Sequence, residues 1–366
     1  MKKVAIDCRM INSSGIGTYL QNNVAGLVDH FEVIALGSSD ELKKFDWYKS
    51  VRVLEFNAPI YSLKEQLMYP ILIPRCEVLW SPHFNVPLLP TRAKKRVVTI
   101  HDVFHLHYYS SLSLFQKIYA SIVFRFAVAL SNKIITVSKF SQQELLKYLK
   151  FSTDKIKVIY NAIEPKVFHK TADASGNLML SELGIVKDRY ILCVGNIKSH
   201  KNIKVVLETI KQNLISADIK LVLVGKIDGL ITSDNQLLQE IARSPQLKER
   251  IIFTNYIETN DLIRLYSSAM IFIFPSLYEG FGIPPLEAMA CECPVIASDI
   301  PVVREICGDA VLYFNPTEPN DLAFKIQQLM NDESLRKHMI TIGIKRVSQF
   351  TWLESVQSHL SVFARL

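Results

Sequence analysis

Aliphatic and β-branched runs of three to six residues recur along the chain, separated by segments with helical periodicity. The first set comprises VAIDC (4–8), VIAL (33–36), VLW (78–80), VVTI (97–100), IITV (134–137) and VIY (158–160). After a polar gap, the second set comprises YILCVG (190–195), LVLVG (221–225), IIFT (251–254), MIFIFP (270–275), PVIAS (294–298) and VLYF (311–314). Runs that are apolar throughout and alternate with helices predict parallel sheets covered on both faces.

Two successive sets of such runs predict an α/β protein with two Rossmann-like, doubly wound domains. We expect the first domain at residues 1–168 and the second at 183–345, joined by the small, polar stretch 169–182 as a linker. The last segment, 346–366, is expected to be a helix that packs back toward the first domain. Ligands on such sheets bind where strands end and loops lead into helices, so a cleft between two facing domains is the expected site.

Composition places the chain among globular proteins, because 49% of its 366 residues are apolar and 21% are charged. No stretch reaches the ~18–20 uncharged apolar residues of a membrane-spanning helix. Asp7 and Arg9 interrupt the apolar stretch at the N-terminus, which disfavours a signal peptide, so a cytoplasmic protein is expected. The six cysteines form no C-x-x-C pair, which predicts buried, reduced thiols and no zinc site.

The positive charge is concentrated in the first half of the chain. Residues 1–165 hold 21 Lys and Arg against 13 Asp and Glu, whereas residues 166–366 hold 21 against 22. This asymmetry predicts an anionic partner for the first half, either a nucleic acid or a membrane surface. A basic surface without a specific partner accounts for it equally well.

The stretch PSLYEGFGIPPLEAMACECPVIAS (275–298) carries the strongest signal for a ligand site. A buried strand ends near Pro275, and Gly280 and Gly282 allow the backbone to approach a ligand closely. Prolines are tolerated in the first turn of the helix that follows, whose free N–H groups suit a phosphate. Glu279 and Glu287 flank this turn, where carboxylates accept hydrogen bonds from sugar hydroxyls. An ordinary acidic first turn of a helix is the alternative.

This stretch resembles the Glu-x7-Glu region of retaining glycosyltransferases of family 4, which have the GT-B fold. The resemblance covers nearly the whole chain, because further motifs follow in the family's order: SSGIGTYL, TIHD, VSKFSQQEL, VIYNAIE, VGNIKSHKN and LVLVG. It implies two Rossmann-like domains facing across a cleft that holds a nucleotide-sugar donor.

The resemblance also implies roles in the second domain. Glu279 would contact the hydroxyls of the donor sugar as a catalytic residue, and Glu287 would hold the ribose. Backbone N–H groups near Phe281, Gly282 and Ile283 would meet the diphosphate. Lys201 would neutralise the departing diphosphate. The family often has a second basic residue where this chain has Asn196, a donor-binding position that His200 or Lys198 would partly replace.

In the first domain, the resemblance implies that the loop of Gly15 and Gly17 approaches the donor phosphates. The G-x-G pattern alone is weak, and a plain glycine turn is the alternative. His101 would touch the donor sugar as a catalytic residue, although a His–Asp pair is more often structural. No D-x-D pair accompanies His101 and its neighbours His83, His105 and His107, so we expect no metal and no cofactor; His83 is a minor candidate for the acceptor side.

The donor base is expected against the loops around Lys226 and Asn255–Ile257, with Tyr256 and Ile257 as contacts. The resemblance is greatest to bacterial polysaccharide mannosyltransferases, which implies a GDP-mannose donor and transfer with retention to a growing, lipid-linked glycan such as O-antigen. Transfer of another sugar from a UDP or ADP donor is the alternative.

We expect the acceptor on the first domain. Residues 113–133 are apolar with three basic residues, and TRAKKR (91–96) adds a basic cluster. Together they indicate peripheral attachment to an anionic membrane at its inner face, with a buried core helix as the alternative. Two other functions are alternatives: a nicotinamide-dependent dehydrogenase, for which the chain lacks a full G-x-G-x-x-G, and a basic, non-enzymatic adaptor, which leaves Glu279 and Glu287 unexplained. No nucleic-acid partner is expected.

Overall fold

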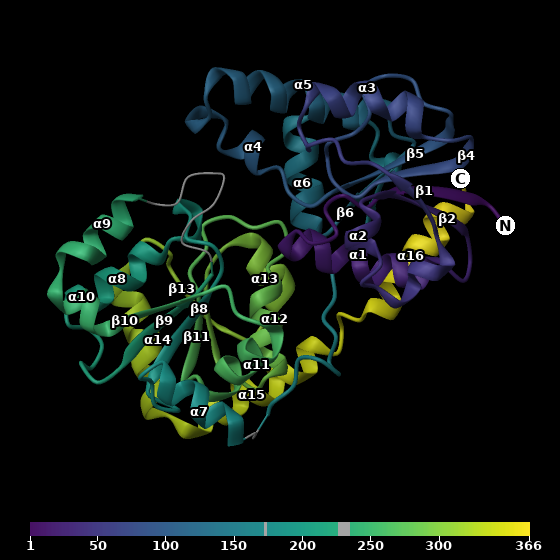
Figure 1. Ribbon diagram of the computed structural model, residues 1–366. Helices are drawn as coiled ribbons and strands as arrows, with labels where there is room; N and C mark the ends of the chain where they lie inside the picture. Colours follow the sequence, from purple (N-terminus) through teal and green to yellow (C-terminus); the bar gives the residue numbers. More distant parts are fainter. Residues whose placement is uncertain (172–173, 226–234) are drawn as a thin grey trace. The chain divides into compact units, whose positions relative to one another are not determined.

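The computed structural model describes residues 1–171, 174–225 and 235–366, and it divides into two compact units. Unit 1 comprises Met1–Ala162 and Phe350–Leu366, and unit 2 comprises Ile163–Gln349. Each unit is a parallel sheet with helices on both faces (Figure 1). The predicted α/β, Rossmann-like fold class is therefore confirmed for each unit.

The sheet of unit 1 has seven parallel strands in the order β3-β2-β1-β4-β5-β6-β7. The strands are β1 (Lys3–Asp7), β2 (Glu32–Gly37), β3 (Arg52–Glu55), β4 (Cys76–Ser81), β5 (Ala93–Ile100), β6 (Lys133–Thr136) and β7 (Ile156–Val158). In the register, Val4 of β1 pairs with Val33 on one side and Val78 on the other. The order reverses between β1 and β4, which is where doubly wound sheets bind ligands.

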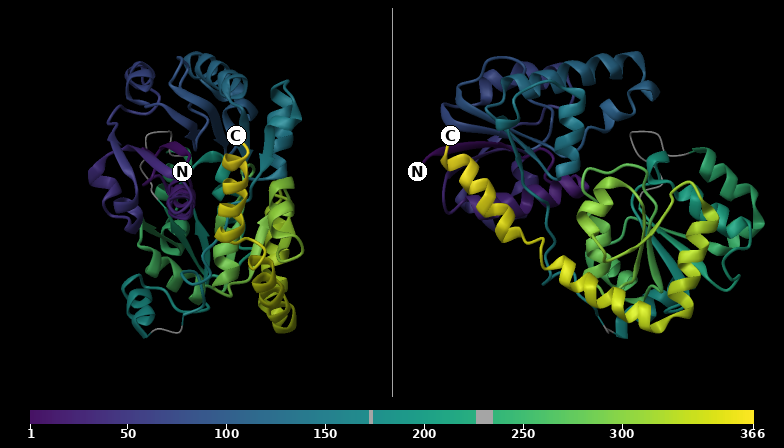
Figure 2. Two further views of the ribbon diagram at one scale, coloured as in Figure 1. Left: turned by 90° about the vertical axis from the view of Figure 1, so that its right-hand side faces the viewer. Right: turned by 180° about the vertical axis from the view of Figure 1, so that it is seen from behind.

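The helices of unit 1 come from both ends of the chain. They are α1 (Ser14–Leu27), α2 (Ser39–Leu42), α3 (Leu63–Leu72), α4 (Phe104–His107), α5 (Leu114–Leu130), α6 (Lys139–Tyr148) and α16 (Trp352–Ala364). Helix α16 packs along α1, with Phe363 fully buried and Val356 against Gly26 (Figures 1 and 2). The C-terminal helix thus completes the core of the first unit.

The sheet of unit 2 has six parallel strands in the order β10-β9-β8-β11-β12-β13. The strands are β8 (Tyr190–Val194), β9 (Lys220–Val224), β10 (Ile251–Asn255), β11 (Ile271–Phe274), β12 (Val295–Ser298) and β13 (Leu312–Phe314). The helices are α7 (Ala174–Glu182), α8 (Ile203–Lys211), α9 (Asn235–Arg243), α10 (Pro245–Arg250), α11 (Thr259–Ser268), α12 (Ile283–Ala290), α13 (Pro301–Cys307), α14 (Pro319–Asn331) and α15 (Glu333–Val347). Here the order reverses between β8 and β11.

The expected linker, 169–182, does not separate the units. Residues 163–171 belong to unit 2, where Lys170 pairs with Glu292 at 2.8 Å and the Thr171 N–H donates to Ser267 Oγ at 3.1 Å. Helix α7 then occupies Ala174–Glu182. The small, polar composition of this stretch indicated a linker, but these contacts join it to the region of helices α11 and α12 in unit 2.

All six cysteines are buried and free, as expected. Their thiols lie among the aliphatic side chains of the strands and adjoining helices. Within the described residues, no helix combines the length and the apolar composition that crossing a membrane requires.

Candidate functional site

The sheet of unit 2 brings Lys201 and Glu279 together at its reversal point. Strands β8 and β11 are neighbours, with Leu192 paired to Phe272, so the loops after them leave the same edge of the sheet. Lys201 ends the short 3-10 helix Ser199–Lys201 after β8, and Glu279 lies in the loop after β11. The hydrogen bond from the Leu277 N–H to the His200 carbonyl, 2.8 Å, joins the two loops.

An ion pair links the two predicted catalytic residues of this unit. Lys201 Nζ lies 2.5 Å from Glu279 Oε1, and the side chains are 21% and 15% exposed. The buried Ser276 hydroxyl donates to the same carboxylate oxygen at 2.7 Å. The Lys201 ammonium also lies 5.7 Å from the centre of the Phe274 ring. The pair is therefore held in place by neighbours while both groups stay accessible.

The loop from Glu279 enters helix α12 through a glycine that the geometry requires. Gly282 has φ +91°, and a Cβ there would lie 3.3 Å from the Phe274 ring, so a side chain is strained at this position. Pro284 and Pro285 follow in the first turn and have no N–H. The amides of Gly282 and Ile283 are therefore the helix-start donors that an anion would meet.

Glu287 sits one turn inside α12 and is held by a residue that sequence reasoning missed. The fully buried Tyr266 of α11 donates its hydroxyl to Glu287 Oε2 at 2.9 Å. Burial raises the pKa of Glu287 from 4.5 to about 7, and the Tyr266 hydrogen bond partly opposes this shift. No local pattern reveals Tyr266, because 21 residues separate the two partners.

The ends of β8, β9 and β10 approach one another closely. A Cβ on Gly225, whose φ is +147°, would lie 2.3 Å from the Gly195 carbonyl oxygen. The Gly225 N–H donates to the Asn255 carbonyl at 3.1 Å. Beyond this edge, Tyr256 is 67% exposed and Ile257 is half-buried, so both are accessible to a ligand. Lys226, the other residue expected near the base, lies outside the described residues.

His200 carries no positive charge of its own beside Asn196. Burial, reinforced by the Lys201 charge, lowers the pKa of His200 from 6.5 to about 4, so the ring is neutral at pH 7. Asn196 is exposed in the loop after β8, and Lys198 is half-buried beside it. Positive charge in this loop therefore comes from Lys198 and Lys201.

In unit 1, His101 lies at the carboxyl end of β5 in an aromatic cluster. Its Nε2 lies 2.9 Å from the Pro82 carbonyl oxygen, and its ring packs edge-on against Tyr19 at 4.9 Å. Burial lowers the pKa of His101 below 6.5. The Asp102 carboxylate accepts from the Phe104 N–H at 2.9 Å instead of holding the imidazole. His101 is thus a neutral ring positioned by the fold.

The two glycines of the first loop differ in their surroundings. Helix α1 begins at Ser14, so both glycines lie in its first turn. Gly15 is exposed, whereas a Cβ on Gly17 would lie 2.4 Å from the Ile11 carbonyl oxygen. Close backbone packing thus requires Gly17 whether or not a ligand is present, and donor binding by Gly15 and Gly17 stays a prediction.

A buried polar network at the reversal point of unit 1 was not predicted. Arg9 pairs with Asp7 at 2.6 Å and with Glu65 of α3 at 2.9 Å. Glu65 also accepts from Asn85 at 2.7 Å, and Asn85 accepts from Tyr119 of α5 at 2.8 Å. Each charge in the network is paired. The network therefore fixes α3 and α5 to the sheet and leaves no unpaired charge for a ligand.

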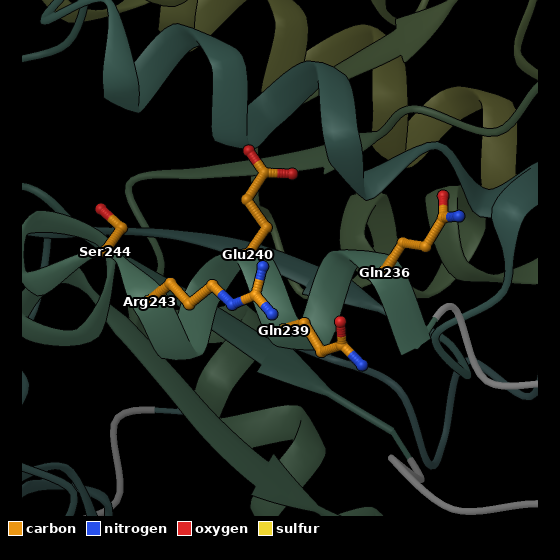
Figure 3. A pocket seen from close by; sticks show the side chains of 5 residues that line it. All are labelled: Gln236, Gln239, Glu240, Arg243 and Ser244. Atoms are coloured by element: carbon orange, nitrogen blue, oxygen red, sulfur yellow. The ribbon is translucent and has the colours of Figure 1, made fainter.

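A separate pocket of about 460 Å³ lies on α9, lined by Gln236, Gln239, Glu240, Arg243 and Ser244 (Figure 3). It contains none of the predicted site residues. Its Glu240 pairs with Lys211 of α8 at 2.5 Å, and its Ser244 caps α10. Two of its polar side chains therefore have structural roles. Among residues 1–171, 174–225 and 235–366, no cluster of His, Cys, Asp or Glu is arranged to hold a metal ion.

Two family models match the chain in succession. The model described as Glycosyltransferase Family 4 matches residues 13–167, and the model described as Glycosyl transferases group 1 matches residues 180–346. Lys201, Glu279 and Glu287 all fall within the second match.

Curated relatives include bacterial polysaccharide enzymes. The O-antigen chain mannosyltransferase RfbU of Salmonella typhimurium is 31% identical over 71% of this chain and 66% of its own length. The serotype-specific mannosyltransferase WbdA of Escherichia coli is 26% identical over 81% of this chain and 35% of its own length. The chain thus spans slightly under two-thirds of the first relative and about a third of the second.

Solved structures share the fold over the full chain. HepE of Anabaena, in complex with UDP-glucose, superposes with a TM-score of 0.81 at 18% identity, covering all of both chains. A sucrose-phosphate synthase from Thermosynechococcus elongatus superposes with a TM-score of 0.79 at 18% identity, covering all of this chain and 99% of that one.

Proposed function

Because this chain belongs to the glycosyltransferases of family 4 and has their GT-B fold, we propose that it transfers a hexose from a nucleotide-sugar donor to a growing glycan. The observation that carries the proposal is the accessible Lys201–Glu279 pair beside the start of α12. An ammonium group, two helix-start amides and a carboxylate within one loop cluster match the diphosphate and hydroxyl groups of such a donor.

Mannose is the sugar we favour, with GDP-mannose as the donor. Support comes from the relatives RfbU and WbdA, whose names give mannosyl transfer in O-antigen or serotype-specific synthesis. The UDP-glucose bound to HepE keeps a UDP-sugar donor as the alternative, since that protein resembles this chain in fold alone. The acceptor we propose is a lipid-linked saccharide of a cell-surface polysaccharide, met at the inner face of the cytoplasmic membrane.

In the proposed reaction, the bond between the sugar C1 and the β-phosphate oxygen breaks, and the electron pair stays on the diphosphate. Lys201 and the amides of Gly282 and Ile283 stabilise that charge. The acceptor oxygen forms the new bond to C1 from the same face, and its proton passes to the departing phosphate oxygen, which retains the anomeric configuration. The proposed mechanism gives no role to a metal ion or to another cofactor.

Glu279 and Glu287 orient the donor in this proposal. Glu279 accepts hydrogen bonds from the sugar hydroxyls, and Glu287 accepts them from the ribose. Without donor, Glu279 balances the Lys201 charge; with donor, the diphosphate takes over as the partner of the ammonium group. His101 in unit 1 contacts the sugar as a neutral hydrogen-bonding group, consistent with its lowered pKa.

A thermal-shift panel with GDP-mannose, UDP-glucose and ADP-glucose tests the proposal, because ligands that bind the folded state raise its melting temperature. We expect the largest rise with GDP-mannose and a smaller rise with the others. If UDP-glucose gave the largest rise in melting temperature, the proposed donor would change to a UDP-sugar and the proposed glycosyl transfer would stand. No rise with any of the three would contradict the proposed function.

A further inference from the structure

Two helices of unit 1 expose apolar side chains in rows. Leu63, Leu67 and Ile71 of α3 are 64% to 85% exposed, and Leu114, Ile118, Ile122 and Phe126 of α5 are 42% to 75% exposed. The members of each row are four residues apart, so each row follows one face of its helix. We call these seven residues the α3–α5 face.

Helices α3 and α5, which carry the two rows, lie on the same side of unit 1 (Figures 1 and 2). Tyr61, just before α3, packs edge-on against Tyr119 of α5 with 5.8 Å between ring centres. Of the 19 large hydrophobic residues that are exposed in the described part of the chain, ten fall between residues 61 and 126. Seven of them form the α3–α5 face on two neighbouring helices, which singly scattered side chains do not explain.

The exposed rows are not the faces by which α3 and α5 pack on the sheet, because each helix buries a different face in the core. Helix α3 turns Glu65 and Tyr69 inward, where Glu65 is fully buried and paired with Arg9, and exposes Leu63 and Leu67. Helix α5 packs Val123, Phe124 and Ala127 into the core. A helix that buries its glutamate and exposes two of its three leucines departs from the usual surface pattern.

The segment of the chain that carries this face is strongly basic. Residues 56–143 hold ten Lys and Arg against three Asp and Glu, so this stretch accounts for the whole net charge of +7. The three acidic residues are engaged: Glu65 with Arg9, Glu77 with the Lys3 N–H and Lys94, and Asp102 with the Phe104 N–H. Arg92 and Arg125 are exposed.

We propose that the α3–α5 face inserts its aliphatic side chains into the surface of an anionic bilayer while the surrounding lysines and arginines meet the lipid headgroups. Helices that lie in a membrane interface have an apolar face flanked by basic residues. Each basic residue near an anionic bilayer strengthens the attraction between the protein and the lipid headgroups. A symmetric contact between two copies would bring two basic surfaces together, so charge disfavours that occupant. The membrane contact is argued independently of the proposed function. Only its role, which is to bring the protein to a lipid-linked acceptor, rests on that function.

Co-sedimentation of the full-length protein with vesicles tests this directly. We expect binding to phosphatidylglycerol-containing vesicles that weakens at high salt, and little binding to phosphatidylcholine vesicles. The double variants Leu67→Gln with Ile71→Gln and Ile118→Gln with Ile122→Gln should each reduce the bound-to-free ratio by at least about tenfold. Leu353→Gln on α16, a site 67% exposed, is the matched control and should bind as the wild type does.

A labelling experiment does not depend on how the double variants fold. The six native cysteines are buried, so Leu67→Cys or Leu353→Cys supplies one accessible thiol for a polarity-sensitive dye. Anionic vesicles should shift the emission to the blue for the label at position 67 and leave the label at 353 unchanged. Equal shifts at both positions, or no shift at 67, would overturn the proposal.

Other outcomes separate this proposal from its rivals and from the enzymatic function. Wild-type binding to neutral and anionic vesicles alike would overturn it, as would sedimentation showing a dimer that the double variants dissociate while no vesicles bind. Nucleotide-sugar binding without vesicle binding would contradict the membrane contact and leave the proposed function standing. Vesicle binding without any nucleotide-sugar binding supports this face and removes the proposed function.

Discussion

At the scale of single residues, the proposed function depends on Lys201 and Glu279, which are 78 residues apart in the sequence and meet at the carboxyl ends of neighbouring strands. Their meeting follows from the order of the strands, since β8 and β11 are adjacent only because the sheet reverses there. The motif around Glu279 and Glu287 allowed both residues to be proposed from the sequence. Their hydrogen-bond partners, Ser276 and Tyr266, were not proposed. Tyr266 lies on another helix, and a hydrogen bond between separate elements leaves no local sequence pattern.

Replacing Lys201 tests the charge that we assign to the diphosphate. Lys201→Ala should weaken the binding of GDP by about tenfold or more, because a charge-assisted hydrogen bond contributes roughly 1.5–3 kcal/mol. Lys204→Ala is the matched control, since Lys204 is exposed on α8 three residues further along. Calorimetric titration measures both affinities. Equal affinities for the two variants would remove Lys201 from the site.

The raised pKa of Glu287 predicts a pH dependence of stability. Its pKa is about 7 in the folded protein against 4.5 for an ordinary glutamate, so between these values the folded state holds a proton that the unfolded chain has lost. The free energy of unfolding contributed by this group therefore falls as the pH rises from about 4.5 to about 7. Glu287→Gln abolishes this contribution.

Melting temperatures at about pH 5 and pH 8 give the measurement. The melting temperature of Glu287→Gln relative to the wild type should be higher at pH 8 than at pH 5. Glu249→Gln, at an exposed site on α10, should follow the wild type at both values. Parallel curves for Glu287→Gln and the wild type would show that the carboxyl is not perturbed.

At the scale of helices and strands, the buried strands were the predictable part, because continuous aliphatic runs admit few other structures. Strand β3 was missed: it lies at the edge of the sheet, is half-exposed, and has Arg52 and Glu55 at its ends. Helix α5 shows why periodicity alone left two alternatives open. It buries one face, as the core-helix alternative required, and exposes another apolar face, so attachment of residues 113–133 to a membrane stays a proposal.

The close approach of β8 and β9 gives a prediction for stability. Gly225→Ala should cost about 2–4 kcal/mol, because the new Cβ meets the Gly195 carbonyl and φ +147° is reserved for glycine. Gly184→Ala is the matched control, since its φ is +65° but nothing lies within 4 Å, and it should cost about 1 kcal/mol. Chemical denaturation measures both, and equal costs would contradict the steric argument.

At the scale of the whole chain, the domain order was predictable from the two sets of strands, whereas the boundaries were not. The end of the first unit depends on contacts that composition does not reveal, such as Lys170 with Glu292. The return of the last segment to unit 1 was expected from residue 346 and occurs at residue 350, so that unit is built from two separate segments. Its stability should therefore depend on the last helix.

Phe363→Ala in α16 tests this dependence. The ring is fully buried against Phe31 and Trp80 of unit 1, so its loss should cost about 3–5 kcal/mol. Leu353→Ala, on the exposed side of the same helix, should change stability by about 0.5 kcal/mol or less. Hydrogen exchange should place the loss of protection in unit 1. A loss confined to unit 2 would contradict the assignment of residues 350–366.

The most direct test of the central claim is the release of nucleoside diphosphate from GDP-mannose by the full-length protein and by Glu279→Gln. The wild type should release GDP faster than buffer alone and faster than it releases UDP from UDP-glucose. Glu279→Gln should slow the release by at least about 100-fold while its melting temperature and its affinity for GDP stay unchanged. Release by Glu279→Gln at the wild-type rate, or no release by the wild type from either donor, would contradict the account.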